Sequence, residues 1–298
     1  MPNWGEVLGE IQSVPNPPGP LDIVRRKYIQ KLHEKTKRNI IVYYSGWLQR
    51  NDASIQSSIY DGDINSFMTV INKLDTRLGL DIVLHTPGGD ISATEALVKY
   101  LRKKFGTNIR CFIPQLAMSA GTMIACSCRE IYMGRQSSIG PIDPQFGGRA
   151  ALAVLRDYQS AVQEIQRNPA TIPLWQAVFA QISPGSLTDC IQAVSLSSEL
   201  VQKWLETGMF DGEADAKKKA KTIVEALNNH DDTKTHARHI DADRAKEIGL
   251  KIEMLEEDDE LQDLVLTVHH ACMHTFALSN KLQKMVENQN GIGVFTFE

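Results

Sequence analysis

No stretch of the 298-residue chain approaches the roughly 18 consecutive apolar residues that a membrane-spanning helix needs. Residues Met1 to Glu10 contain a proline, a tryptophan and acidic side chains instead of a basic start and an apolar core, so we expect no secretory signal there. The five cysteines are odd in number and scattered, which favours reduced thiols over a disulfide framework. We therefore expect a cytoplasmic protein without an integral membrane segment.

A strong excess of charge of one sign is also lacking. The formal net charge is −4 at pH 7, which argues against a general nucleic-acid binder. Cys126 and Cys128 have no other cysteine or histidine close in sequence, and His270 and His274 share a helical face without the glutamate of a zincin motif. We therefore predict neither a metal site nor a cofactor.

Two strand-turn-helix units lie in the middle of the chain. In the first, an apolar strand segment leads into Thr86–Gly89 and then into an amphipathic helix over Ile91–Phe105. In the second, a run of β character at Ile109–Ile113 precedes a small-residue helix over Ser119–Ala125. Such alternation predicts a parallel sheet, and ligands of parallel sheets gather at the carboxyl ends of the strands.

The residues at these turns suit acyl-transfer chemistry. Ser119 is expected at a strand-to-helix junction, where free N–H groups and the helix dipole favour developing negative charge. A serine at this position can equally be only an N-cap. Gly88 and Gly89 can present backbone N–H groups because no Cβ blocks close approach, and such donors suit an oxyanion hole.

Successive units ending in Pro-Gly-Gly and in Met-Ser-Ala-Gly resemble the Clp protease and signal-peptide-peptidase branch of the crotonase-like superfamily. Within that branch, the chain from about Leu21 onward resembles the serine dehydrogenase proteinase family. The resemblance implies an α/β fold with a crotonase/Clp-protease-like repeated β-β-α core and a parallel sheet. By position it also implies that Ser119 is the nucleophile, with Gly89 or Gly88 and the Ala120 amide as oxyanion donors.

A serine hydroxyl is a poor nucleophile until a base takes its proton. Clp proteases carry a histidine on the strand after the serine helix, but the corresponding position here falls near Gly140, where there is no histidine. Signal-peptide peptidases use a lysine, and this chain has none between Lys104 and Lys203. The base must therefore come from another segment.

The leading candidate is His236, since the resembled family has a histidine followed by an aspartate at this place. Ala237 stands where that aspartate would be, so a complete Ser-His-Asp triad is not expected. His239, His85 and Asp143 are possible supporting residues. Each of these has a plainer interpretation, as a polar loop residue, a strand-end histidine and a turn aspartate.

The domain organisation is predicted from the same patterns. Residues 1–20 form an N-terminal helical arm with a proline-rich linker, and residues 21–255 form the core, with a helical insertion at about 150–230. Residues 256–298 are expected to be a C-terminal helical extension with a helix over about Glu260–Glu287, part of which packs on a partner chain. The arm is also expected to pack on a neighbouring subunit.

These features together imply an ATP-independent serine peptidase that acts on peptide or protein substrates within a homo-oligomer. Two alternatives stay open. One is a crotonase-type enzyme that acts on a coenzyme A thioester, which would use the same paired amides for an enolate. The other is a catalytically inactive oligomeric scaffold, because neither a histidine nor a lysine stands at the positions where the resembled proteases carry the base.

Overall fold

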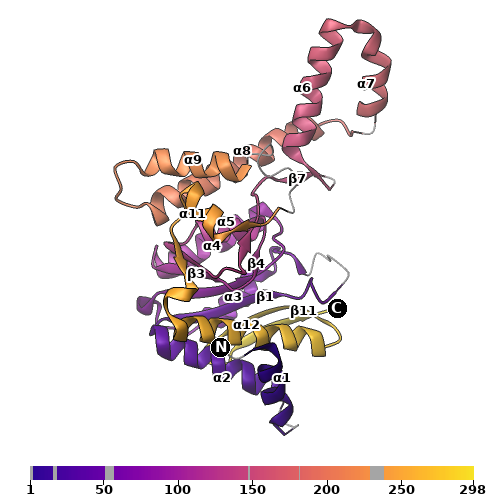
Figure 1. The fold of residues 1–298 in the computed structure, drawn as a ribbon. Coiled ribbons are helices and arrows are strands. Elements are labelled where there is room, and N and C mark those ends of the chain that lie inside the picture. The colour runs from indigo at the N-terminus through magenta and orange to yellow at the C-terminus, as the bar shows by residue number, and fades with distance from the viewer. Residues whose placement is uncertain (1–2, 16–18, 51–56, 147, 181, 229–237) are drawn as a thin grey trace.

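The computed structural model describes residues 3–15, 19–50, 57–146, 148–180, 182–228 and 238–298. At its centre lies a seven-stranded sheet in the order β10-β5-β3-β2-β1-β11-β12 (Figure 1). Its strands are β1 (Asn39–Ser45), β2 (Leu80–His85), β3 (Ile109–Ile113), β5 (Glu130–Met133), β10 (Ile252–Met254), β11 (Leu282–Asn288) and β12 (Gly293–Phe297). The strands from β10 to β1 pair in parallel, and β11 and β12 are antiparallel. The predicted α/β class with a mainly parallel sheet is thus confirmed.

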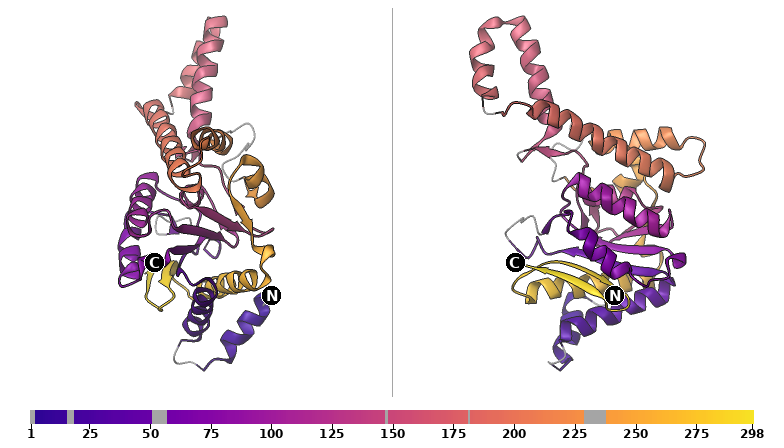
Figure 2. Two further views of the ribbon diagram at one scale, coloured as in Figure 1. Left: turned by 90° about the vertical axis from the view of Figure 1, so that its left-hand side faces the viewer. Right: turned by 180° about the vertical axis from the view of Figure 1, so that it is seen from behind.

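Helices cover both faces of this sheet (Figure 2). One face packs against α3 (Asp63–Ile71), α4 (Ile91–Phe105), α5 (Ala120–Cys126) and α11 (Ala242–Ile248), and the other against α2 (Pro20–Thr36) and α12 (Asp259–Leu278). Strand β2 shows the period of two that this requires: Ile82 and Leu84 join the first apolar cluster, and Val83 joins the second. β2 is buried along its whole length, as expected for a strand covered on both faces.

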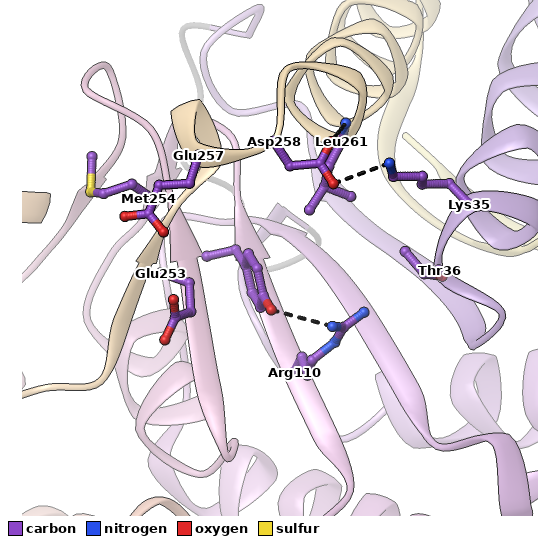
Figure 3. Close-up of a pocket in the computed structure, with 9 residues that line it drawn as sticks. Lys35, Thr36, Arg110, Glu253, Met254, Glu257, Asp258 and Leu261 are labelled. Carbon is purple, nitrogen blue, oxygen red and sulfur yellow. Dashed lines mark hydrogen bonds and ion pairs between the residues drawn. The ribbon is translucent and has the colours of Figure 1, made fainter.

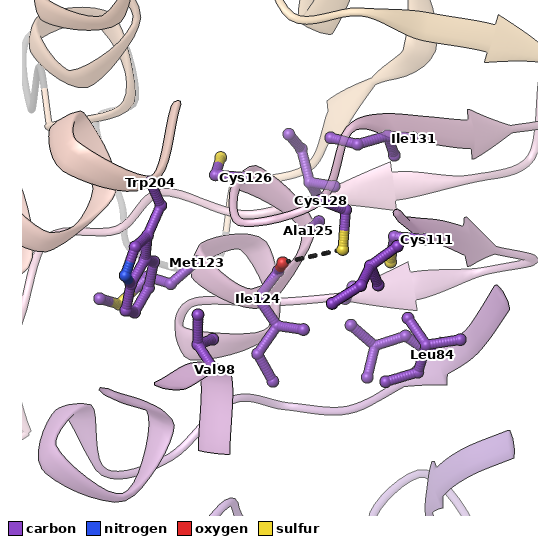
Figure 4. Packing of buried hydrophobic residues seen from close by; sticks show 14 of the residues in the cluster. Leu84, Val98, Cys111, Met123, Ile124, Ala125, Cys126, Cys128, Ile131 and Trp204 are labelled. Atoms are coloured by element: carbon purple, nitrogen blue, oxygen red, sulfur yellow. Dashed lines mark hydrogen bonds between the residues drawn. The ribbon is translucent and has the colours of Figure 1, made fainter. Parts of the chain in front are cut away.

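A smaller sheet lies beyond the carboxyl ends of the central strands. It contains β4 (Leu116–Ala117), β6 (Ser138–Ile139) and β9 (Ile240–Asp241), and a bridge between Thr86 and Ala117 joins it to the end of β2. Under it, α5 is packed into the core (Figure 4). Cys126 and Cys128 are buried in this apolar cluster, and the Cys128 Sγ lies 3.3 Å from the Ile124 carbonyl oxygen.

The segment expected to be a helical insertion is helical along most of its described length. A short hairpin of β7 (Gln145–Phe146) and β8 (Arg149–Ala150) leads into α6 (Ala151–Arg167), the 3₁₀ turn η3 (Pro169–Thr171), α7 (Ile172–Phe179), α8 (Ser186–Trp204), the π-helical turn η4 (Leu205–Met209) and α9 (Ala216–Asn228). The pair α6 and α7 projects away from the sheet layers as an arm (Figures 1 and 2). Of the helices that the structure describes, none is long and apolar enough to cross a membrane.

The C-terminal region differs from the predicted helical extension. The helix expected to continue to about Glu287 ends at Leu278, and the chain returns as the hairpin of β11 and β12. β11 pairs with β1, so the apolar face of α12 covers the sheet of its own chain. Residues 256–298 are therefore part of the core, and the apolar helix face needs no partner chain to cover it.

The N-terminal arm also packs within its own chain. Helix α1 (Trp4–Ser13) begins at Asn3, which forms a capping box with Glu6. Its buried residues Val7 and Ile11 contact an apolar cluster that includes Val24 of α2 and Ala271 of α12. Helix α1 thus packs on α2 and α12 of its own chain, and its packing on a neighbouring subunit stays a prediction.

Candidate active site

Ser119 occupies a strained turn between β4 and α5. Its backbone angles are φ 52° and ψ −115°, a region that residues other than glycine rarely adopt and that costs about 1–3 kcal/mol. Although Ser119 stands at the N-cap position of α5, its side chain makes no capping hydrogen bond. The plain N-cap interpretation therefore does not explain this serine. The turn has the geometry of a strand-to-helix elbow, which presents a side chain outward.

Neighbouring contacts fix this turn in place. The Gly121 N–H donates to the Met118 carbonyl at 2.8 Å, and the Met123 N–H donates to the Ser119 carbonyl at 3.1 Å. The Thr122 hydroxyl oxygen lies 2.9 Å from the Ala117 carbonyl oxygen and accepts a hydrogen bond from the Gly140 N–H at 3.0 Å. The strain at Ser119 is thus held by bonds on both sides of it.

Gly88 and Gly89 lie directly against this turn, with φ of 101° and 155°. A Cβ on Gly88 would come within 2.7 Å of the Ser119 Cβ and 3.0 Å of the Ala120 nitrogen, so only glycine fits. The Gly88 N–H donates to the Thr86 hydroxyl at 3.2 Å, whereas neither the Gly89 nor the Ala120 N–H donates to another described residue. Of the two glycines, Gly89 thus has the amide available for a ligand.

The segment before α3 reaches the glycine turn through the backbone of Ile59. The Ile59 N–H donates to the Gly88 carbonyl at 2.8 Å, and the Ile59 carbonyl accepts from the Asp90 N–H at 2.9 Å. A Cβ on Gly89 would lie 2.3 Å from the Ile59 backbone, which explains the second glycine. The sequence offered no signal for this contact, because it joins two segments about thirty residues apart through backbone atoms only.

Ser119 opens onto a cleft of about 670 Å³. The cleft is lined by Ser58, Ile59, Tyr60, Pro87, Gly88, Gly89, Asp90, Ile91, Ser92, Ser119, Met123, Ile142, Pro144, Gln145, Ala193 and Leu196. Its far wall comes from Ile142, Pro144 and Gln145, at the entry to the β7–β8 hairpin, and from α8. The mixture of apolar walls with a few polar groups suits an extended chain with uncharged side chains.

A second, smaller cavity of about 380 Å³ lies between α2, β3 and β10 (Figure 3). Its cations are already paired: Lys35 lies 3.1 Å from Asp258, and Arg110 lies 2.6 Å from Asp81. Because its cations are paired and it contains neither Ser119 nor the paired glycines, this cavity is not the candidate site.

The candidate bases are placed very differently. His236 and Ala237 lie outside the described residues. His239 is exposed, immediately before β9, and β9 pairs with β6, the strand that leads into Gly140 beside the serine turn. Asp143 is buried between two residues that line the cleft, and its Oδ2 accepts from the Gln145 amide at 3.3 Å.

His85 lies on the other face of the sheet. It is fully buried, and its ring centroid is 4.3 Å from that of Trp47 and 5.5 Å from that of His269 on α12. Neither ring nitrogen has a hydrogen-bond partner in the described part of the chain. Burial, and then the neighbouring His269, hold the pKa of His85 well below 6.5; the Leu116 backbone offsets this only in part, without reaching hydrogen-bond geometry.

The residues described by the structure contain no group of three or more histidine, cysteine, aspartate or glutamate side chains arranged to hold a metal ion. All five cysteines are free and buried.

Comparison with known proteins identifies a family. The model of the ClpP-like SDH-type serine proteinases matches residues 20–267. Two relatives are uncharacterized proteins of Methanocaldococcus jannaschii. MJ1495 is 27% identical over 191 residues, 64% of this chain and 57% of that protein. MJ0137 is 25% identical over 237 residues, 78% of this chain and 74% of that protein. The chain thus spans a little over half the length of the first relative.

Proposed function

The chain belongs to the family of ClpP-like SDH-type serine proteinases, and on that premise we propose that it hydrolyses peptide bonds through an acyl-enzyme on Ser119. The observation that supports this most directly is the strained turn of Ser119. Its hydroxyl is not used as a helix cap, and it lies against Gly88. Strain of this kind at a cleft is typical of a residue held for chemistry.

In the proposed reaction, the Ser119 Oγ attacks the carbonyl carbon of a peptide bound in the cleft. The negative charge that develops on the carbonyl oxygen is stabilised by the amides of Gly89 and Ala120, with Gly88 setting their approach. The base takes the serine proton and passes it to the leaving amine, and water then hydrolyses the ester. No nucleotide or metal enters these steps.

We assign the base to His236, on the positional match to the family and on the path of the chain. The described residues that follow it enter β9, which pairs beside the serine turn. Asp143 and His239 are supporting candidates near the same turn. One observation favours a second candidate function, an inactive scaffold: the cleft lining that the structure describes contains no histidine or lysine.

Labelling with a fluorophosphonate, followed by intact mass and peptide mapping, tests both assignments. We expect one adduct on Ser119, formed at a rate that rises through roughly pH 6 to 7 as the imidazole becomes neutral. Ser119→Ala should give no adduct, and His236→Ala should lose the pH-dependent step. Ser127→Ala, at the other end of α5, is the matched control and should label normally.

An absent adduct on the wild type, or an equal adduct on Ser119→Ala, contradicts the nucleophile assignment. Binding of a coenzyme A thioester without labelling would favour the crotonase-type reaction, and neither labelling nor binding would favour the scaffold. A wild-type rate and pH profile in His236→Ala would transfer the role of base to another residue, with Asp143 and His239 next to test.

We also propose a homo-oligomer, now assembled through the α6–α7 arm. Apolar side chains on this arm stay exposed, with exposed fractions of 63% for Leu174, 39% for Val162 and 38% for Ile172. Light scattering at micromolar concentration should give a multiple of 33.3 kDa. Leu174→Ser should lower that mass, whereas Leu278→Ser on α12, where the side chain is 55% exposed, should not. A wild-type monomer would refute the proposal.

A further inference from the structure

A buried ion pair lies behind the cleft wall and takes no part in the steps above. Lys284 on β11 is 1% exposed, and its Nζ lies 2.8 Å and 2.9 Å from the two carboxylate oxygens of Asp63 at the start of α3. Burial lowers the pKa of Lys284, and the adjacent carboxylate offsets part of this. Burying such a pair costs desolvation energy that the attraction often fails to repay, so stability alone does not account for it.

The pair holds one short segment from both sides. The Asp63 Oδ2 accepts hydrogen bonds from the Tyr43 hydroxyl at 2.7 Å and from the Tyr60 N–H at 3.1 Å. The Lys284 Nζ also donates to the Ser58 carbonyl and lies 4.3 Å from the centre of the Tyr60 ring. The residues on either side of Ile59 are thus bonded to the same ion pair.

Ile59 links the segment held by this ion pair to the Gly88–Gly89 turn. Its N–H and carbonyl bond to the residues on either side of Gly89, namely the Gly88 carbonyl and the Asp90 N–H. Since the Ile59 backbone fills the space where a Gly89 side chain would lie, any shift of Ile59 moves the Gly89 peptide plane. The direction of the Gly89 N–H is therefore set by a chain of contacts that ends at Lys284 and Asp63.

We propose that the Lys284–Asp63 ion pair is a positioning element for the oxyanion-binding turn, which it fixes through the segment Ser58–Tyr60. This inference rests on the proposed function. Lys284 touches none of the proposed reacting atoms and acts through Ile59. An amide donor must lie within a few tenths of an ångström of its productive position, and a misplacement of about 1 Å costs about 10²-fold in rate.

The same strand offers a matched control. Glu287, also on β11, forms a second buried ion pair with Arg25 of α2, with the Arg25 Nε 2.6 Å from the Glu287 Oε2 and both side chains fully buried. β11 pairs antiparallel with β1, so Lys284 lies opposite Ser45 at the site end of β1, and Glu287 lies opposite Val42, farther from it. Removing Lys284 leaves the buried Asp63 carboxylate without this cation, whereas removing Arg25 leaves Glu287 still bonded to Arg26 at 2.6 Å. Only the first pair is linked to Gly89.

The test compares Lys284→Met with Arg25→Met. We expect both to lower the melting temperature, and only Lys284→Met to lower kcat for a peptide substrate, by about 10²-fold, with KM little changed. Hydrogen exchange followed by mass spectrometry should show faster exchange in peptides covering 57–61 and 86–90 in Lys284→Met alone. If Lys284→Met does not fold, Lys284→Met with Asp63→Asn removes the unpaired charge and should show the same kcat and exchange effects.

Phosphonate labelling of the wild type on Ser119 distinguishes a failure of the positioning role from a failure of the proposed function. If the wild type labels, and Lys284→Met or the double variant keeps the wild-type kcat and the wild-type exchange at 86–90, the positioning role is overturned while the proposed function stands. Equal losses of kcat in Lys284→Met and Arg25→Met would also overturn it, because both pairs would then be merely structural. A wild type that does not label overturns both proposals.

Discussion

Two groups of reactive residue types flank the carboxyl end of strand β2, one on each side of the sheet. On one side, the Gly88–Gly89 turn and Ser119 face an open cleft, with two amides that make no hydrogen bond to other described residues. On the other side, His85 is enclosed by Tyr44, Trp47 and His269 on the face covered by α12. His85 and Gly88 are only three residues apart.

The difference shows that accessibility and backbone geometry, more than residue type, distinguish the candidate site. Histidine is the side chain most suited to proton transfer near neutral pH, but His85 is fully buried, and burial holds its pKa well below 6.5. The cleft side relies instead on backbone N–H groups, which need only glycines and a strained turn to become available. The alternation of strand β2 decides which residue reaches which side.

Gly88→Ala should have the largest effect on the cleft side. The new methyl group would lie 2.7 Å from the Ser119 Cβ and from the Met118 carbonyl oxygen, so the two halves of the site must move apart. We expect Ser119 labelling to fall by about 10²- to 10³-fold, the loss typical of removing one oxyanion donor. Phosphonate labelling rates measure this directly.

Gly212→Ala is the control, because that glycine has a similar φ of 80° and no atom within 4 Å of the added methyl group. It should show the cost of the backbone conformation alone, about 1 kcal/mol in the free energy of unfolding, with full labelling. Equal labelling in the two variants would show that close approach at Gly88 does not matter for the serine.

The turns that hold the two glycines and the serine could be located from the sequence, because such turns depend on local sequence. Pro-Gly-Gly and Met-Ser-Ala-Gly each follow a strand pattern, and each marks a turn. Which face His85 takes was not predictable, since its strand is apolar on both sides and the alternation of polar and apolar residues is lost. The contact of Ile59 with the glycine turn could not be predicted from the sequence either, because it consists of long-range backbone hydrogen bonds.

The C-terminal error has a similar origin. The apolar period of α12 was correctly recognised, but its end at Leu278 was missed and strand β11 was included in the helix. β11 carries buried Lys284 and Glu287, which form ion pairs with Asp63 and with two arginines far away in sequence. The Asn290-Gly291 pair, with Gly291 at φ 73°, was the available hairpin signal.

His85→Leu should have the smallest effect at neutral pH, and it tests the other side of the comparison. A buried histidine without hydrogen-bond partners contributes little that leucine cannot replace. Ser119 labelling should therefore be unchanged, and the free energy of unfolding at pH 7 should change little. A difference in stability between His85→Leu and the wild type is expected when the pH is lowered.

The direction in which stability changes with pH follows from the depressed pKa values of His85 and His269. The pKa of His269 is about 3. Both stay neutral in the folded chain, whereas unfolding lets them take up protons below about pH 6.5, so stability is present above that pH and is lost as the pH falls. Each such histidine lowers the free energy of unfolding by about 1.4 kcal/mol for each pH unit below 6.5, which is about 2 kcal/mol at pH 5. His85→Leu should recover that amount relative to the wild type, as measured by urea unfolding at pH 7 and pH 5.

His239→Gln, at an exposed site, is the control for the loss of one histidine. If His85→Leu and His239→Gln show the same pH dependence, His85 is not a buried neutral histidine. If His85→Leu instead abolishes labelling of Ser119, the two sides of the sheet act together. The conclusion that the buried His85 is independent of the Ser119 cleft is then wrong.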